Sequence, residues 1–169
     1  KREKIPAGAL RPELAHILCL AGGVKAKDTV LDMFAGYGSI PLEAVRGFGC
    51  RQVIAVDNQA LPKRHELTLI KWHKSDARKL DFIDDDSIAR IITDPPWGVY
   101  DNKTEQDMTL LYADFTKEMR RVLKPGGVAV VLTGWQQSEY ILKERLNLIA
   151  KWPILVSGNK ATIFKMQKL

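Results

Sequence analysis

The sequence is poor in cysteine and has no long apolar run. Cys19 and Cys50 are its two cysteines, too few for a disulfide framework or a structural zinc site. No apolar stretch reaches the about 18 residues that a membrane-spanning helix needs. Three of the first four residues are basic, but Arg11 and Pro12 interrupt the pattern of a secretory signal. These absences predict a protein of a reducing compartment, the cytoplasm, with no membrane association.

Internal repeats, low-complexity segments and linkers are also absent. The 169 residues are 46% hydrophobic and 27% charged, which is the balance of an ordinary globular protein. This length predicts one domain over residues 1–169, with residues 1–28 leading into its core. The chain begins at Lys1 without a methionine, which is compatible with a piece of a longer protein.

Short apolar runs alternate with helical patterns along the chain. The predicted strands cover 29–35, 52–57, 70–75, 89–93 and 128–133, and the predicted helices cover 13–22, 39–48, 108–123 and 136–146. Two last runs, 149–156 and 161–166, flank a Gly-Asn turn and predict an antiparallel hairpin. The pattern therefore predicts an α/β fold: a doubly wound, mostly parallel, seven-stranded sheet with helices on both faces and a C-terminal β-hairpin. A polar loop is expected over 98–106.

Four acidic residues stand at or beside successive strand ends. They are Asp32, Asp57, Asp76 and Asp94. An aspartate at one strand end is common, because Asp favours turns. Four in register with a glycine turn are harder to explain in this way, because ligands of such sheets bind at the carboxyl ends of the strands.

The first of these acids opens residues 32–38 (DMFAGYG). Gly36 and Gly38 allow a sharp turn and a close approach of the backbone to a ligand. The dinucleotide fingerprint is not met, because Pro41 takes the place of its third glycine. Asp32 would repel a pyrophosphate and suits a positively charged group or an amine instead.

The next two acids point to a nucleoside. Asp57 lies about 20 residues after the glycine turn, a position that suits hydrogen bonds to ribose hydroxyls. Together with Asp32 it indicates a nucleoside that carries a cationic tail and no phosphates. Asp76 has two interpretations: it accepts a hydrogen bond from an adenine amine, or it is a surface residue beside Arg78.

Residues 94–97 (DPPW) carry the most specific pattern. The two prolines stiffen the turn and remove two backbone donors, which leaves bare carbonyls at the site. Asp94 and the carbonyl of Pro95 can both accept a hydrogen bond from a planar NH₂ group, and an exposed Trp97 can stack on the ring that bears it. The alternative is a core tryptophan after a Pro-Pro turn.

With these motifs the sequence resembles the Rossmann-fold S-adenosylmethionine-dependent methyltransferases. Residues 32–38 are similar to their cofactor loop, and residues 94–97 to the motif of enzymes that methylate exocyclic amines. Residues 6–12 (PAGALRP) and the helix after them resemble the segment before the cofactor loop in RNA methyltransferases that carry a THUMP domain. The aspartate version of the tetrapeptide, followed by Gly98, is similar to their tRNA guanine-N2 members.

This resemblance implies S-adenosylmethionine as the cofactor and a role for each matched residue. The implied cofactor-binding residues are Arg11, Pro12, Asp32, Phe34, Ala35, Gly36, Gly38, Asp57, Asn58, Asp76 and Ala77. The implied catalytic residues are Asp94, Pro95, Pro96 and Trp97. No metal is expected, because the histidines His16, His65 and His73 show no ligand spacing.

The preferred function is therefore methylation of an exocyclic base nitrogen in RNA, with N2 of guanine in tRNA as the first choice. The net charge of +6 permits RNA as the partner. If the chain is a piece of a longer protein, an N-terminal RNA-binding domain outside it would read the RNA; if it is complete, substrate choice works differently. The alternatives are an N6-adenine or N4-cytosine methyltransferase of DNA or rRNA, a protein glutamine methyltransferase, and a non-catalytic subunit. A nicotinamide oxidoreductase is disfavoured by Asp32 and the missing third glycine.

Overall fold

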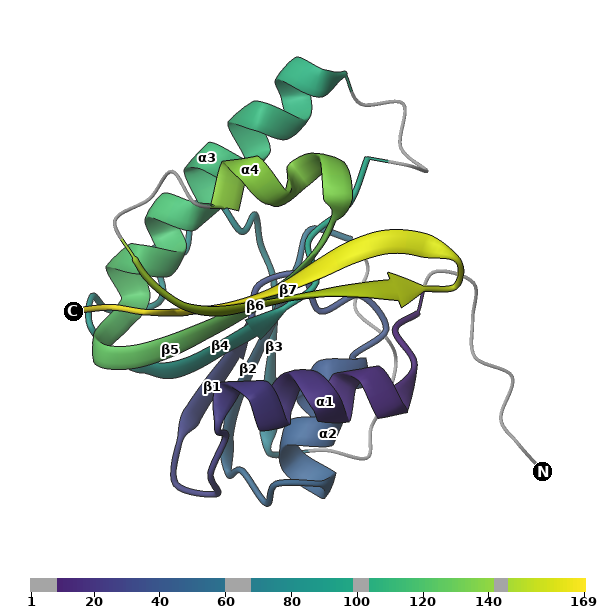
Figure 1. Cartoon of the computed structure of the whole chain (residues 1–169). Coiled ribbons are helices and arrows are strands. Elements are labelled where there is room, and N and C mark those ends of the chain that lie inside the picture. Colours follow the sequence, from purple (N-terminus) through teal and green to yellow (C-terminus); the bar gives the residue numbers. More distant parts are fainter. Residues whose placement is uncertain (1–8, 60–67, 99–103, 142–145) are drawn as a thin grey trace.

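The computed structural model describes residues 9–59, 68–98, 104–141 and 146–169 (Figure 1). Strands and helices alternate in the order α1 (Pro12–Gly22), β1 (Thr29–Asp32), α2 (Ser39–Arg46), β2 (Gln52–Asp57), β3 (Ile70–Lys74), β4 (Ile88–Thr93), α3 (Glu105–Val122), β5 (Leu123–Gly134), the 3₁₀ turn η1 (Trp135–Gln137), α4 (Ser138–Ile141), β6 (Asn147–Val156) and β7 (Asn159–Gln167). The predicted segment 6–12 and loop 98–106 lie partly outside the described residues.

The strands form one seven-stranded sheet in the order β3-β2-β1-β4-β5-β7-β6. The five strands β1 to β5 pair in parallel, and β7 pairs antiparallel with both β5 and β6. The predicted fold class is confirmed, the closing hairpin included. The chain direction across the sheet reverses between β1 and β4, so the loops after these two strands part and leave a crevice at their carboxyl ends.

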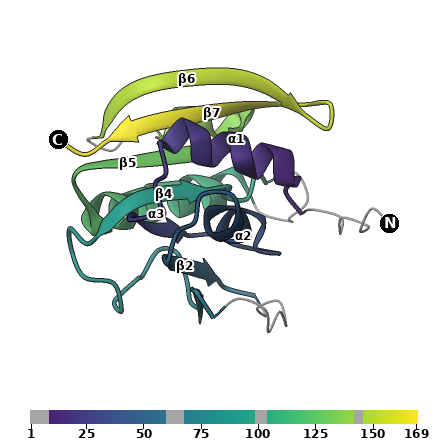
Figure 2. The same cartoon turned by 90° about the horizontal axis from the view of Figure 1, so that it is seen from below.

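Helices cover both faces of the sheet, α1 and α2 on one and α3 and α4 on the other (Figures 1 and 2). The apolar residues of α3 recur every three or four positions, which turns them all to one side of the helix. That side is buried against the sheet at Met108, Tyr112, Phe115, Met119 and Val122. A second apolar cluster joins α1 and α2 to the opposite face. No helix of the described segments is both long and apolar enough to cross a bilayer.

The largest departure from the predicted elements is at the start of β5. The strand predicted over 128–133 begins five residues earlier, at Leu123, directly after α3 ends at Val122. Ile88 pairs with Leu123 and Arg90 with Val128, so residues 124–127 (KPGG) bulge out of the ladder. The amide of Gly126 and the carbonyl of Gly127 bond to Lys168 beyond β7. These tertiary hydrogen bonds hold the bulged segment against the sheet.

Other differences are small. β1 stops at Asp32, three residues before the predicted end, because its carboxylate accepts the amide of Phe34 and turns the chain out of the sheet. The predicted helix over 136–146 is a 3₁₀ turn followed by the single turn of α4, and residues 142–145 lie outside the description. The helix predicted from Met108 begins earlier, at Glu105, behind a capping box between Thr104 and Asp107.

Candidate functional site

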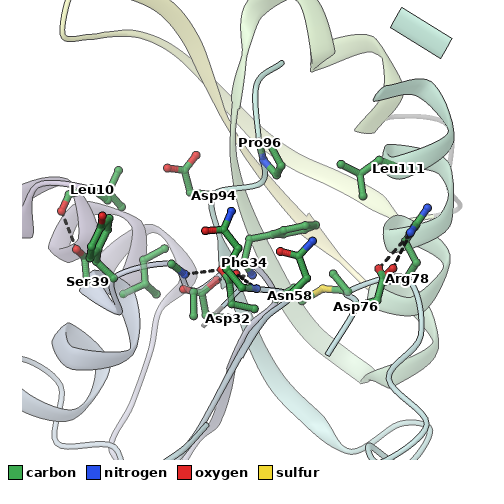
Figure 3. Close-up of a pocket in the computed structure, with 18 of the residues that line it drawn as sticks. Leu10, Asp32, Phe34, Ser39, Asn58, Asp76, Arg78, Asp94, Pro96 and Leu111 are labelled. Atoms are coloured by element: carbon green, nitrogen blue, oxygen red, sulfur yellow. Dashed lines mark hydrogen bonds and ion pairs between the residues drawn. The ribbon is translucent and has the colours of Figure 1, made fainter. Parts of the chain in front are cut away.

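A cavity of about 570 Å³ opens at the carboxyl ends of the strands (Figure 3). Its volume lies in the range of small-ligand sites. It is bounded by the N-terminal segment before α1, the β1–α2 loop, the end of β2, the β3–β4 loop, the end of β4 and α3. The lining residues are Ala9, Leu10, Asp32, Met33, Phe34, Ala35, Gly36, Tyr37, Ser39, Ile40, Asp57, Asn58, Gln59, Asp76, Ala77, Arg78, Asp94, Pro96, Asp107, Leu110 and Leu111.

All four predicted acids line this one cavity: Asp32, Asp57, Asp76 and Asp94. Figure 3 shows Asp76 and Arg78 together toward the α3 side, with Asp32 and Asp94 on the other side of the cavity. The acids at the strand ends therefore meet at one edge of the sheet, as the sequence pattern predicted.

The glycine turn and Asp57 form one hydrogen-bonded unit. Gly36 has φ 48°, a left-handed conformation that glycine adopts without strain. Its amide donates to Oδ2 of Asp57 at 2.7 Å, while the amide of Gln59 donates to Oδ1 at 2.9 Å. No atom lies within 4 Å of the position that a Cβ of Gly36 would take, so the turn presents open backbone to the cavity.

Gly38 serves packing rather than the cavity. A Cβ at this position would lie 2.5 Å from the ring of Trp72 on β3, and Gly38 has φ 83°. It does not line the cavity. The predicted contact of Gly38 with a cofactor is therefore not supported by its position, and its requirement for glycine has a structural cause.

Asp32 is almost inaccessible, with 2% of its surface exposed. Its Oδ1 accepts from the hydroxyl of Thr93 at 2.9 Å and from the amide of Phe34 at 3.1 Å. The pKa of Asp32 is raised to about 7, chiefly by burial and to a smaller extent by the carboxylates of Asp94 and Asp57, while the two hydrogen bonds oppose the rise. A positively charged ligand would favour its ionised form.

Asp94 follows β4 directly and is partly buried. Its Oδ1 accepts from the indole Nε1–H of Trp97 at 2.9 Å. Burial raises the pKa of Asp94 to about 7, and the hydrogen bond from Trp97 opposes the rise. Asp32 and Asp94, whose pKa values are both raised to about 7, thus line the same cavity, and perturbed pKa values of this kind are typical of functional sites.

The structure corrects the interpretation of Trp97. The side chain is not an exposed stacking face: it is partly buried, packs against the apolar cluster on the α1 side, and does not line the cavity. Its location is closer to the alternative of a packed tryptophan after the Pro-Pro turn. Stacking was favoured because aromatic residues near strand ends often meet planar ligands, whereas here the indole turns back to Asp94.

The two prolines also differ from expectation. Pro95 is buried and does not line the cavity, whereas Pro96 does. The carbonyl of Pro96 is not bare, because the hydroxyl of Tyr112 donates to it at 3.0 Å. Tyr112 is fully buried on α3, and its oxygen also lies 2.8 Å from Oγ1 of Thr133 on β5. The tetrapeptide turn is therefore tied to both α3 and β5.

Asp76 is engaged by its neighbour Arg78. The Arg78 amide donates to Oδ1 at 2.9 Å, and its guanidinium bonds both oxygens, with Nη2 at 2.6 Å from Oδ2. Both side chains are about half exposed, at 42% for Asp76 and 48% for Arg78. Ala77, the other predicted residue of this loop, is buried and lines the cavity.

Arg11 and Pro12 do not line the cavity, whereas Leu10, just before them, does. The Arg11 carbonyl accepts the amides of Leu14 and Ala15 in the first turn of α1, so this pair starts a helix. Leu10 lines the cavity instead, and its carbonyl accepts the hydroxyl of Ser39 at 2.7 Å. Of the described residues of segment 6–12, Ala9 and Leu10 line the cavity, whereas Arg11 and Pro12 do not.

Sequence reasoning missed the contribution of α3. Asp107, Leu110 and Leu111 lie three or four positions apart, so they share one side of the helix and line the cavity. The same spacing predicted the helix, but nothing in it indicated that its first turns extend beyond the sheet edge.

No metal-binding group of three or more His, Cys, Asp or Glu residues occurs within the described ranges. His16 bonds Glu43 at 2.7 Å, and His73 stacks on Phe82 with ring centroids 4.2 Å apart. His65 lies outside the described residues.

Comparison with known proteins identifies the domain. The family model described as "RMKL-like, methyltransferase domain" matches residues 49–148. The chain is 28% identical over 175 residues to tRNA (guanine(10)-N2)-dimethyltransferase of Methanothermobacter thermautotrophicus, covering 98% of the chain and 51% of the relative. It is 31% identical over 135 residues to tRNA (guanine(6)-N2)-methyltransferase of Thermus thermophilus, covering 75% of the chain and 40% of the relative.

Solved structures agree on the fold. TrmN from Thermus thermophilus superimposes with a TM-score of 0.83 at 28% identity, over 96% of this chain and 50% of that one. Geranyl diphosphate C-methyltransferase from Streptomyces coelicolor has a TM-score of 0.72 at 16% identity, over 93% and 78% of the two chains, and shares the fold alone. The chain spans about half the length of the first curated relative, 51%, and 40% of the second.

Proposed function

Because the chain belongs to the family of RMKL-like methyltransferase domains, we propose that it transfers a methyl group from S-adenosylmethionine to N2 of a guanine in tRNA. The observation that carries the proposal is the meeting of two motifs in one cavity. The Gly36–Asp57 unit and the carboxylate of Asp94 both line it, from the ends of β1, β2 and β4. A cofactor cradle and an acceptor for a substrate amine are thus within one enclosure.

The residues of the cavity fit S-adenosylmethionine. The open backbone at Gly36 leaves room for the cofactor's ribose and methionine parts, and Asp57 is an acceptor for ribose hydroxyls. Asp32 and Asp94 supply negative charge at the centre, which suits a ligand that carries a sulfonium and an ammonium group. When bound, the cofactor supplies an electrophilic methyl group on a good leaving group.

Asp94 is the residue that would face the substrate amine. Its ionised carboxylate accepts an N–H of the exocyclic amine, which directs the nitrogen lone pair toward the methyl carbon. As the N–C bond forms, the S–C bond breaks and its electron pair stays on sulfur. The amine then gives up one proton, which the carboxylate of Asp94 would accept. The chain's contribution is mainly to orient the reactants.

A guanine in tRNA is the substrate that the relatives favour. Both curated relatives carry tRNA guanine-N2 methylation in their names, and a net charge of +6 suits a phosphate-rich partner. A base within a stem would have to leave the stack to reach Asp94. We propose that residues 1–169 act as one methyltransferase domain, and that recognition of the tRNA draws on an RNA-binding domain outside this chain.

The test is transfer of labelled methyl from S-adenosylmethionine to unmodified tRNA, followed by digestion to nucleosides. Labelled N2-methylguanosine is the expected product, and the variant Asp94→Ala is the matched control that should yield none. Label in N6-methyladenosine or N4-methylcytidine would overturn the choice of guanine. Label that survives nuclease and is lost on proteolysis would identify a protein amide as the target.

A further inference from the structure

We propose that Trp97 acts on methyl transfer through Asp94: its indole N–H holds Oδ1 of the carboxylate, so that Oδ2 is the oxygen presented to the substrate amine. The inference rests on the proposed function and assigns the fourth residue of the DPPW motif a positioning role in place of base stacking. Trp97 itself does not touch the reacting atoms, because it does not line the cavity.

The geometry of the pair carries this assignment. Nε1 of Trp97 lies 2.9 Å from Oδ1 of Asp94, three residues earlier in the chain. An ionised carboxylate has acceptor sites on both oxygens. A donor on Oδ1 fixes the rotation of the carboxylate and leaves Oδ2 to the substrate, and a bond of this kind is stronger than one between neutral groups.

The indole of Trp97 is itself held in place by packing. Its ring packs against the apolar cluster on the α1 side of the sheet, and its Cβ and Cγ lie against Gly134 at the end of β5. A Cβ on Gly134 would approach these two atoms to 3.2 and 3.3 Å. Glycine at this position therefore leaves the space that Trp97 occupies, and the packed ring keeps its N–H directed at Asp94.

The turn between the two side chains is fixed as well. The hydroxyl of Tyr112 donates to the carbonyl of Pro96 and lies 2.8 Å from Oγ1 of Thr133. Pro96 lies between Asp94 and Trp97 in the chain, so this contact restricts the path of the backbone that joins them. The tetrapeptide is thus secured by Tyr112 from α3 and by the Trp97 indole, and the carboxylate of Asp94 is the group left facing the cavity.

Replacement of Trp97 by phenylalanine separates the two roles that this residue could have. Phenylalanine keeps an aromatic ring and has no N–H donor, so a stacking role would survive and a positioning role would not. The matched control is Trp152→Phe, because Trp152 is 42% exposed on β6 and does not line the cavity. Both variants would be compared with the unchanged chain in steady-state methylation of tRNA and in binding of S-adenosylmethionine.

In Trp97→Phe we expect kcat at pH 7 to fall about tenfold or more, the loss of one hydrogen bond to a charged group. KM for tRNA should change less than about twofold, because the bond acts on the reacting group rather than on binding. Without its donor, the ionised form of Asp94 is less stable, so the acid limb of the kcat profile should move about one unit to higher pH. Trp152→Phe should match the unchanged chain in all three.

A second measurement does not depend on activity. The ¹³C resonance of the Asp94 carboxyl, followed by NMR as a function of pH, should titrate at a higher pH in Trp97→Phe than in the unchanged chain. If the phenylalanine variant does not fold, benzothienylalanine at position 97, which replaces N–H by sulfur in the same shape, serves for both measurements.

An unchanged Asp94 titration together with an unchanged pH profile of kcat would overturn the proposal, even if the variant were less stable. Absence of methyl transfer in the unchanged chain, with the Asp94 titration still moved by Trp97→Phe, would overturn the proposed function and leave the hydrogen-bonded pair established.

Discussion

The four acids of the cavity divide into two pairs that differ in everything except residue type. Asp32 ends the central strand β1 and Asp94 follows the central strand β4, and the pKa of each is raised to about 7, chiefly by burial. Asp57 ends β2 and Asp76 follows β3, nearer the sheet edge; both are partly exposed, with carboxylates bonded to backbone amides or to Arg78. The position of the strand within the sheet, rather than the residues next to each aspartate in the sequence, separates the two pairs.

The difference indicates a division of labour. A carboxyl group that titrates near neutrality responds to the charge of a ligand and can take up or release a proton at working pH. A carboxylate at the rim that is already hydrogen-bonded offers its remaining lone pairs as fixed acceptors. The central pair therefore suits the charged and reacting groups, and the rim pair suits the neutral hydroxyl and amine groups of a nucleoside.

The sharpest test of this division is Asp94→Ala. We expect methyl transfer to fall by about a thousandfold or more, because general acid–base and orienting roles of this kind contribute about 10² to 10⁴. The dissociation constant of S-adenosylmethionine should stay within a few fold. Radiolabel transfer and isothermal titration calorimetry measure the two quantities. Loss of cofactor binding with retained chemistry would reverse the assignment of the central pair.

The opposite result is expected at the rim, in Asp57→Ala. Loss of this carboxylate removes acceptors for the ribose and also the partner of the Gly36 amide, which lies 2.7 Å away. We expect the dissociation constant of S-adenosylmethionine to rise about 10- to 100-fold, the range for hydrogen bonds to a charged group. The value of kcat at saturating cofactor should fall much less. An unchanged dissociation constant would exclude Asp57 from the cofactor site.

The third expectation concerns pH. A cationic ligand favours the ionised forms of Asp32 and Asp94, so their pKa values fall below about 7 when it binds and protons are released. Affinity for S-adenosylmethionine should then rise between about pH 6 and 8, by up to tenfold per unit for each proton released. Calorimetry in buffers of different ionisation enthalpy counts the protons.

Asp32 and Asp94 also affect the pH dependence of the free energy of unfolding of the ligand-free protein, but in the opposite direction. Between about pH 4 and 7 the folded chain binds more protons at Asp32 and Asp94 than the unfolded chain does, so the free energy of unfolding should decrease as pH rises. Asp32→Asn should flatten this slope. A slope that the substitution leaves unchanged would show that Asp32 does not titrate in this range.

Much of the fold and of the arrangement of the four acids was predictable from the sequence, because both depend on local patterns. The apolar run of β2 gave its bounds of 52–57 without error, and strand ends in a parallel sheet necessarily bring their following residues to one edge. These are statements about periodicity and spacing, which a sequence contains. The methyltransferase family was recognised separately, by the resemblance of residues 32–38 and 94–97 to its motifs.

The rest depends on contacts between residues far apart in the chain. The orientation of Trp97 follows from space beside Gly134, and the engagement of the Pro96 carbonyl follows from Tyr112, 16 residues away. Residues 124–127 carry a strong helix-ending pattern, yet bonds to Lys168 place them at the start of β5. In each case a side chain or backbone group could interact with residues near it in the sequence, but packing favours an interaction with a residue far away in the chain.

The smallest expected effect belongs to Asp76→Ala. The resemblance to methyltransferases assigns this residue to the adenine amine, but the Arg78 guanidinium already bonds both of its oxygens, with Nη2 at 2.6 Å from Oδ2. An exposed pair of this kind contributes about 0–1 kcal/mol to stability, so the melting temperature should barely move. We expect the dissociation constant of S-adenosylmethionine to rise less than about threefold, the equivalent of one weak hydrogen bond.

Arg78→Ala sharpens this last expectation, because it removes the guanidinium that bonds both oxygens of Asp76 while leaving the carboxylate in the cavity wall. If Arg78 competes with the adenine amine, this variant should bind the cofactor at least as tightly as the unchanged chain. A loss in Asp76→Ala as large as that in Asp57→Ala would instead mean that the Asp76–Arg78 pair opens when the cofactor binds. The two rim acids would then be equivalent, and the division of the four acids would rest on the central pair alone.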